Sequence, residues 1–199
     1  MLKNLRIATK LALGFGFVLI MLAIIAFIGI TRLSGLSEDM EKIVGDRYPK
    51  TVMAHEVMDQ LNVVARAIRN AILTDKEDAI RADLKRIEEA RAIIGKNLGQ
   101  LEKEITSEKG KELLKTIVAA RGKYVTNLDL FLKLFAENKK DEARNLLMGE
   151  MRSAQADYFA ALDKLIEFQG GQMNDAGVEA KASYEPSRTL MLTLAIAAT

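Results

Sequence analysis

Residues 80–105 read IRADLKRIEEARAIIGKNLGQLEKEI, and the spacing of their apolar side chains decides the fold. Apolar residues recur at alternating intervals of four and three, the pattern of a helix that packs along one seam of a bundle. The seam positions are Ile80, Leu84, Ile87, Arg91, Ile94, Leu98, Leu101 and Ile105. This stretch therefore predicts a long amphipathic helix with one buried face.

Three further segments show the same spacing. The first seam consists of Val57, Leu61, Val64, Ile68 and Ala71. The third consists of Leu114, Val118, Arg121, Val125, Leu128, Leu132 and Phe135. The fourth consists of Leu147, Met151, Ala154, Tyr158, Ala161, Leu165 and Phe168. The breaks at 74–76, 106–108 and 138–141 are short, which makes neighbouring helices antiparallel. The sequence predicts an all-α, up-down-up-down antiparallel four-helix bundle.

Local signals mark where these helices bend and begin. Gly45 and Pro49 are expected to kink or interrupt the first helix before its seam starts. Ser107 offers a hydroxyl cap to the third helix. The pair Gly170 and Gly171 is expected to make the fourth helix locally more flexible.

The composition excludes several classes of function. The chain has 199 residues, of which 49% are hydrophobic, and its net charge of +2 leaves no broad basic face for nucleic acid. Cysteine is absent and His55 is the only histidine, which excludes thiol chemistry, disulfides and metal sites built on these residues. We expect no cofactor, no metal ion and no catalytic residue.

The stretch 11–31 contains no charged residue and predicts a membrane helix. At a rise of 1.5 Å per residue it spans about 31 Å, close to the roughly 30 Å of a hydrocarbon core. The basic residues before it are Lys3, Arg6 and Lys10. Such a cluster tends to stay cytoplasmic, so 1–10 is predicted to be a cytoplasmic tail. A cleaved signal peptide is the alternative, but its apolar region is usually only about 7–15 residues long.

Residues 190–199 are again apolar and uncharged. A helix of this length is too short to cross a bilayer, so we interpret it as the start of a truncated second transmembrane helix. Tyr184 and Arg188 come just before it, and both residue types are common at membrane interfaces. Residues 32–189 are then predicted to be an extracytoplasmic domain between two membrane helices.

This arrangement resembles the four-helix-bundle sensor module of methyl-accepting chemotaxis proteins. The local stretches that carry the likeness are RNAIL at 69–73, Ala120-Arg121 with Tyr124, and ADYFAAL at 156–162. The resemblance implies a homodimer or higher assembly in the bacterial inner membrane, with its sensor domain in the periplasm. It also implies a cytoplasmic coupling protein and a histidine kinase, reached through a part beyond residue 199.

Polar residues at seam positions suggest a ligand site in the bundle. Arg91, Arg121 and Tyr158 stand where apolar residues are the rule, because burial of an unpaired charge is costly. Counted from the distal turns, they and Tyr124 fall within about 6 Å of one level. Arginine and tyrosine donate hydrogen bonds to carboxylates, so this layer predicts a site for a small carboxylate.

A structural role is the alternative for each of these residues. Arginine can extend outward to an acidic side chain, and tyrosine can simply fill the core. For Arg91, the neighbouring Ala90 can face inward instead, with Glu88 as the ion-pair partner.

A second candidate cluster lies on the first helix. Asn62, Arg66 and Arg69 form one stripe, and Asn70 is adjacent. By resemblance to the aspartate and serine receptors of the family, Arg66, Arg69 and Asn70 are candidates for a ligand site at a subunit interface. An ordinary solvated stripe is the alternative. The two clusters are expected to differ by about 10–15 Å in height, so one small ligand is not expected to touch both.

The sequence thus favours the input module of a chemoreceptor that senses a small organic anion. Candidate ligands are a dicarboxylic acid, a tricarboxylic acid or an amino acid, bound directly or through a periplasmic binding protein. Two alternatives stay open: the input domain of a sensor histidine kinase or cyclic-dinucleotide enzyme, and a ligand-free dimerisation stalk.

Overall fold

The computed structural model describes residues 6–198, and these residues form helices and turns without any strand. Along the chain the elements are α1 (Ile7–Glu41), the π-helical turn η2 (Lys42–Arg47), α2 (Tyr48–Leu73), α3 (Glu77–Glu104), α4 (Glu108–Ala136), α5 (Lys140–Met148) and α6 (Glu150–Ala198). Lys3 of the predicted tail and Thr199 of the predicted second anchor lie outside the described residues. The chain divides into two compact units, which are considered separately.

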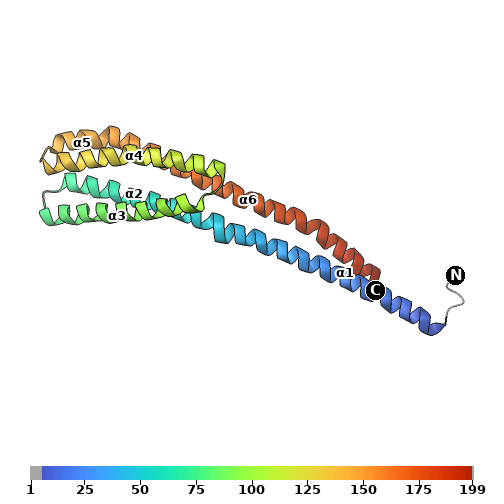
Figure 1. Cartoon of the computed structure of the whole chain (residues 1–199). Helices are drawn as coiled ribbons and strands as arrows, with labels where there is room; N and C mark the ends of the chain where they lie inside the picture. The colour runs from blue at the N-terminus through green and yellow to red at the C-terminus, as the bar shows by residue number, and fades with distance from the viewer. Residues whose placement is uncertain (1–5, 199) are drawn as a thin grey trace. The chain divides into compact units, whose positions relative to one another are not determined.

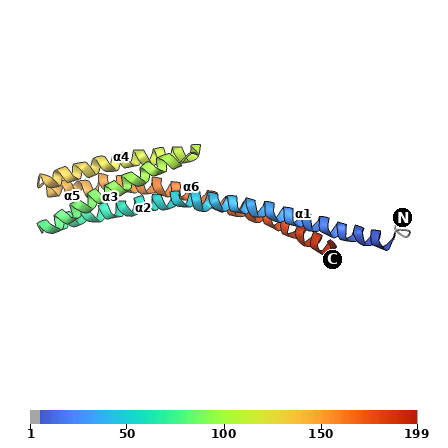
Figure 2. The same cartoon turned by 60° about the horizontal axis from the view of Figure 1, so that its bottom comes forward.

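The first unit, Asp46–Gln172, is the bundle. Its four rods are α2, α3, α4, and α5 followed by the first part of α6. The turns that join α2 to α3 and α4 to α5 lie at one end of this unit in both views (Figures 1 and 2). Successive rods are therefore antiparallel, which confirms the predicted all-α four-helix bundle.

The core of the bundle follows the predicted seams in the first and fourth rods. The five seam residues of α2 are fully buried, and the seam of the fourth rod is buried from Leu147 to Leu165. In α4 the predicted seam is confirmed at Leu114 and Leu128 but wrong at Val118, which is 41% exposed. The buried residues of α4 are Gly110, Leu114, Ile117, Ala120, Tyr124, Leu128 and Phe131. Apolar residues occupy two neighbouring stripes of α4, and packing selects the stripe that places two aromatic rings in the core.

Interruptions of the helices agree in part with the sequence. The π-helical turn Lys42–Arg47 includes Gly45, and Pro49 stands in the first turn of α2, where a missing N–H is tolerated. Ser107 caps α4 by accepting a hydrogen bond of 3.2 Å from the backbone N–H of Gly110. The break at Gly149, which separates α5 from α6, was not predicted. α6 is continuous through Gly170 and Gly171.

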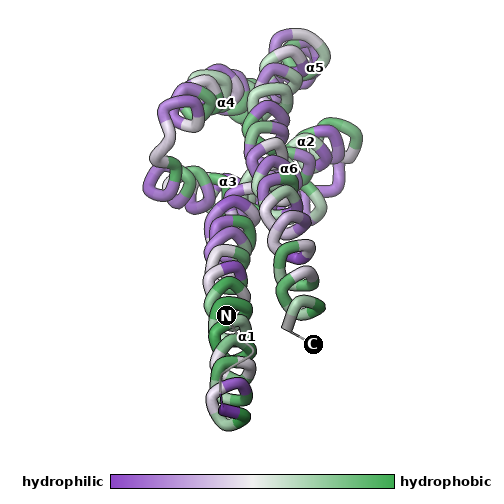
Figure 3. Tube along the Cα trace, turned by 90° about the vertical axis from the view of Figure 1, so that its right-hand side faces the viewer, coloured by the Kyte–Doolittle hydropathy of each residue, from purple (hydrophilic) through white to green (hydrophobic). Residues whose placement is uncertain are grey.

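The second unit comprises the described parts of Met1–Gly45 and Met173–Thr199. Among residues 6–198, one helical stretch near the N-terminus is long and apolar enough to cross a membrane. Its apolar side chains, such as Phe15 and Phe27, are exposed, and hydrophobic residues follow much of α1 (Figure 3). The length and composition of α1 thus meet the requirements for the predicted anchor.

Candidate functional site

Two tyrosines meet inside the bundle. Tyr124 of α4 and Tyr158 of α6 are 2% and 1% exposed, and their ring centroids are 6.1 Å apart with an angle of 55° between the ring planes. Among the described residues, neither hydroxyl has a hydrogen-bond partner. A buried polar group without a partner costs about 1–3 kcal/mol. The tyrosine pair is therefore a polar, unsatisfied point in a mostly apolar core.

Each phenol lies within the electrostatic influence of one arginine. Burial raises the pKa of Tyr124 far above its usual value, and the charge of Arg69 opposes this rise. Burial likewise raises the pKa of Tyr158, and the charge of Arg121 opposes it. Both phenols consequently stay protonated at neutral pH and keep an O–H available for donation.

The guanidinium of Arg121 lies beside Gly95 of the neighbouring helix. A Cβ atom added to Gly95 of α3 would stand 3.8 Å from the Nη2 atom of Arg121, so the guanidinium lies against the backbone of α3. Arg121 is half-buried, and it forms no ion pair with any described residue. The outward ion pair considered from the sequence is thus not formed, and the guanidinium keeps its donors free.

Arg69 is exposed on α2, and its charge still acts on Tyr124. Attraction between a charge and a buried phenol does not require contact, so the expected separation of about 10–15 Å along the helix axis stays a prediction. We call Arg69, Arg121, Tyr124 and Tyr158 the tyrosine constellation, because the charges of the two arginines act on the two phenols.

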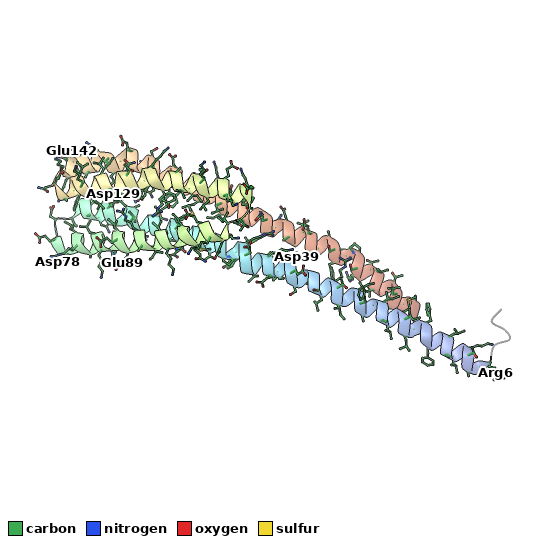
Figure 4. The ribbon with its side chains drawn as sticks, viewed as in Figure 1. Arg6, Asp39, Asp78, Glu89, Asp129 and Glu142 are labelled. Atoms are coloured by element: carbon green, nitrogen blue, oxygen red, sulfur yellow. The ribbon has the colours of Figure 1, made fainter. Side chains whose placement is uncertain are left out.

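Arg91 does not belong to this constellation. Ala90 takes the buried position, and Arg91 is only half-buried. Its Nη1 atom donates a hydrogen bond of 2.7 Å to Oδ1 of Asp129. Asp129 lies on α4 (Figure 4). The structural alternative is thus the one observed, except that the partner is Asp129 and not Glu88. Asp129 escaped the sequence analysis because it is far from Arg91 along the chain.

The other two candidates, Arg66 and Asn70, line a separate groove between α2 and α3. The groove has a volume of about 240 Å³. Its lining residues are Val63, Arg66, Ala67, Asn70, Asp83 and Arg86. Asp83 and Arg86 were missed by the sequence analysis, which treated the charges of α3 as solvated. The signal that was available is the position of Asp83 directly before the seam residue Leu84.

The chain matches the model of one known protein family. The family is described as a four helix bundle sensory module for signal transduction, and the match covers residues 4–184. The chain belongs to this family. Its members are sensory and non-catalytic domains, so the chain is a sensory input module for signal transduction. No curated protein matches the chain.

Membership confirms the sensory module that the resemblance indicated. Family membership also bears on how the buried hydroxyls of Tyr124 and Tyr158 are interpreted. In a purely structural bundle, unsatisfied hydroxyls only lower the stability of the fold, whereas in a sensory module they are potential contacts for a ligand.

Proposed function

We propose that this sensory module is the input part of a methyl-accepting chemoreceptor, and that it binds a small organic anion at Tyr124 and Tyr158. The observation that carries the proposal is the pair of buried hydroxyls without partners, each under the electrostatic influence of one arginine. A carboxylate accepts hydrogen bonds from both phenols and guanidinium groups. Such a ligand would satisfy donors that the bundle itself leaves unused.

The charges around the phenols favour a particular class of acid. Arg69 and Arg121 are the ionised groups that act on them, and both are positive. A dicarboxylic or tricarboxylic acid matches two cations better than a zwitterionic amino acid does, because an ammonium group would be repelled. We therefore expect a ligand with at least two carboxylates.

The same constellation suggests how binding produces a signal. Tyr158 lies on α6, which is one helix from Glu150 to Ala198. A ligand shifts an equilibrium only through different affinities for two states. A state of α6 in which both hydroxyls reach the ligand would be favoured on binding, and a displacement of α6 would travel along the helix toward the end of the chain.

In this proposal the chain crosses the bacterial inner membrane at 11–31, with 1–10 in the cytoplasm. Residues 32–189 form the periplasmic domain, and 190–199 begin the second anchor. The receptor would be a homodimer, and a cytoplasmic coupling protein and histidine kinase would be controlled by a part beyond residue 199. The apolar α1 and the family match support this arrangement.

Isothermal titration of the full chain in lipid nanodiscs tests the ligand proposal. Succinate, malate, citrate and aspartate are the probes, and Arg121→Gln is the decisive variant. We expect one of the acids to bind saturably, and Arg121→Gln to weaken it about 10- to 100-fold, the effect of one charged hydrogen bond.

Arg91→Gln is the matched control, since Arg91 is also a half-buried arginine but is paired with Asp129. It should leave the affinity unchanged. Absence of binding by every acid, with binding restored only by a periplasmic binding protein, would refute direct recognition. Equal losses in the two arginine variants would refute the assigned position.

A further inference from the structure

A pocket of about 290 Å³ lies between α1 and the C-terminal part of α6. Its lining residues fall within 29–39 and 180–191, so the whole pocket belongs to the second unit. These two helical segments lie side by side in both views (Figures 1 and 2). The pocket begins inside the uncharged stretch 11–31 and extends past its end, into the part of α1 that carries charges.

The lining of this pocket changes from apolar to charged along the helices. On α1 it runs from Gly29 through Arg32 to Asp39, and on α6 the apolar Met191 and the hydroxyl of Ser187 line it. A phospholipid has the same order of groups, with its acyl chains first, its phosphate next and its terminal headgroup outermost. The order of residue types in the pocket therefore matches that of a membrane lipid.

Two unused hydrogen-bond donors line the middle of the pocket. Arg32 is exposed and forms no hydrogen bond or ion pair with another described residue. The hydroxyl of Tyr184, on the α6 wall, is likewise without a partner among the described residues. Guanidinium and phenol groups both donate to phosphate oxygens, and the fork of an arginine can reach two of them at once.

Asp39 adds the opposite charge at the outer end of the pocket. Its Oδ1 atom accepts a hydrogen bond of 3.0 Å from Nζ of Lys42, one turn further along α1. Lys42 is exposed, so water weakens its attraction for the carboxylate. A carboxylate has two oxygens, and Asp39 can still accept a hydrogen bond from a second cation. The pocket thus offers a cation and an anion, about 10 Å apart along the helix axis.

We propose that this pocket binds a membrane phospholipid whose headgroup carries a phosphate and a primary ammonium, namely phosphatidylethanolamine. Arg32 and Tyr184 donate to the phosphate, and Asp39 accepts from the ammonium group. The volume equals that of about ten water molecules in the liquid, and a phosphoethanolamine headgroup has a similar number of non-hydrogen atoms. The proposal rests on the membrane placement of α1 in the proposed function, and not on its dicarboxylate ligand.

The two charges distinguish this lipid from other common phospholipids. Phosphatidylglycerol carries a phosphate but no cation, so Asp39 would repel it. Phosphatidylcholine carries a quaternary ammonium, which has no N–H to donate to Asp39. Phosphatidylethanolamine supplies both the phosphate and the N–H donors.

Native mass spectrometry of the full chain tests the proposal. The chain is inserted into nanodiscs that contain equal amounts of the three phospholipids with identical acyl chains, and the lipids that stay bound on release are identified. We expect phosphatidylethanolamine to be retained about 3- to 10-fold more than either of the others, the effect of one hydrogen bond to a partly solvated charge.

Two variants separate the roles of the charges. Arg32→Gln should lower the retention of all three lipids, since each carries a phosphate. Asp39→Asn should abolish the preference for phosphatidylethanolamine without loss of total lipid. Arg188→Gln and Glu38→Gln are the matched controls, because Arg188 and Glu38 are exposed and do not line the pocket. Both should behave as the parent chain, and far-ultraviolet circular dichroism verifies the helical content of all four variants.

Several results would overturn the pocket assignment. Equal retention of the three lipids by the parent chain is one, and an unchanged preference in Asp39→Asn is another. A dimer that retains no lipid would indicate that a second copy fills the pocket instead. Failure of the chain to enter nanodiscs would overturn the membrane placement and the pocket together. Absence of dicarboxylate binding would refute only the ligand of the proposed function, and retention of phosphatidylethanolamine would then still support the pocket.

Discussion

Replacement of Tyr158 by phenylalanine separates two effects of the buried hydroxyl: its effect on the stability of the ligand-free bundle and its contribution to ligand binding. The ring fills the same space in the variant, so the packing against Tyr124 is kept. The hydroxyl is buried without a partner, and this costs about 1–3 kcal/mol. We therefore expect Tyr158→Phe to raise the free energy of unfolding of the ligand-free bundle by about that amount.

The corresponding change in melting temperature is measurable. For a chain of about 150–250 residues, 1 kcal/mol shifts the melting temperature by about 2–4 °C. The ligand-free variant should thus melt about 2–12 °C higher than the parent chain. Far-ultraviolet circular dichroism is the suitable signal, because the chain contains no tryptophan.

The ligand should stabilise the parent chain more than the Tyr158→Phe variant. A saturating dicarboxylate stabilises the form that binds it, and the parent chain has one more donor to offer. We expect a larger ligand-induced rise in melting temperature for the parent chain than for Tyr158→Phe. Tyr48→Phe is the control, since Tyr48 is exposed at the start of α2 and its loss should change stability by less than about 0.5 kcal/mol.

A lower melting temperature for ligand-free Tyr158→Phe than for Tyr48→Phe would refute the reasoning. It would mean that the hydroxyl of Tyr158 already has a stabilising partner in the free bundle. An equal ligand-induced rise in the parent chain and in Tyr158→Phe would refute the role of this hydroxyl in binding.

Two further predictions concern ion pairs. Arg91→Gln is expected to lower the free energy of unfolding by less than about 1 kcal/mol, because the ion pair of Arg91 with Asp129 is open to solvent. Thermal melts of Arg91→Gln and Asp129→Asn measure this loss, and a larger loss in either variant would contradict the prediction. The hydrogen bond and charge of Lys140 lower the pKa of Asp75, so this carboxylate adds stability above about pH 4 that disappears as the pH falls through its lowered pKa. The small difference in melting temperature between the parent chain and Asp75→Asn should therefore vanish in acid, and a pH-independent difference would contradict the assignment.

Much of the fold follows from local patterns. The intervals of four and three in α2 and α3 determine helices with one apolar face, because the side chains of a helix repeat every 3.6 residues. Ser107 marks the start of α4 through its side-chain oxygen, an interaction within one turn. The apolar stretch 11–31 similarly determines a helix suited to a membrane by composition alone.

The sequence by itself therefore determined how many long helices form, roughly where they begin and that they pack as a bundle. Only the tertiary structure decided that Ile117 and Tyr124, and not Val118, enter the core of α4. It also decided that Arg69 acts on Tyr124 and that Arg91 pairs with Asp129. The physical reason is that periodicity describes one helix at a time. The rotation of each helix and its register against its neighbours depend on how side chains from distant parts of the chain fill a shared core.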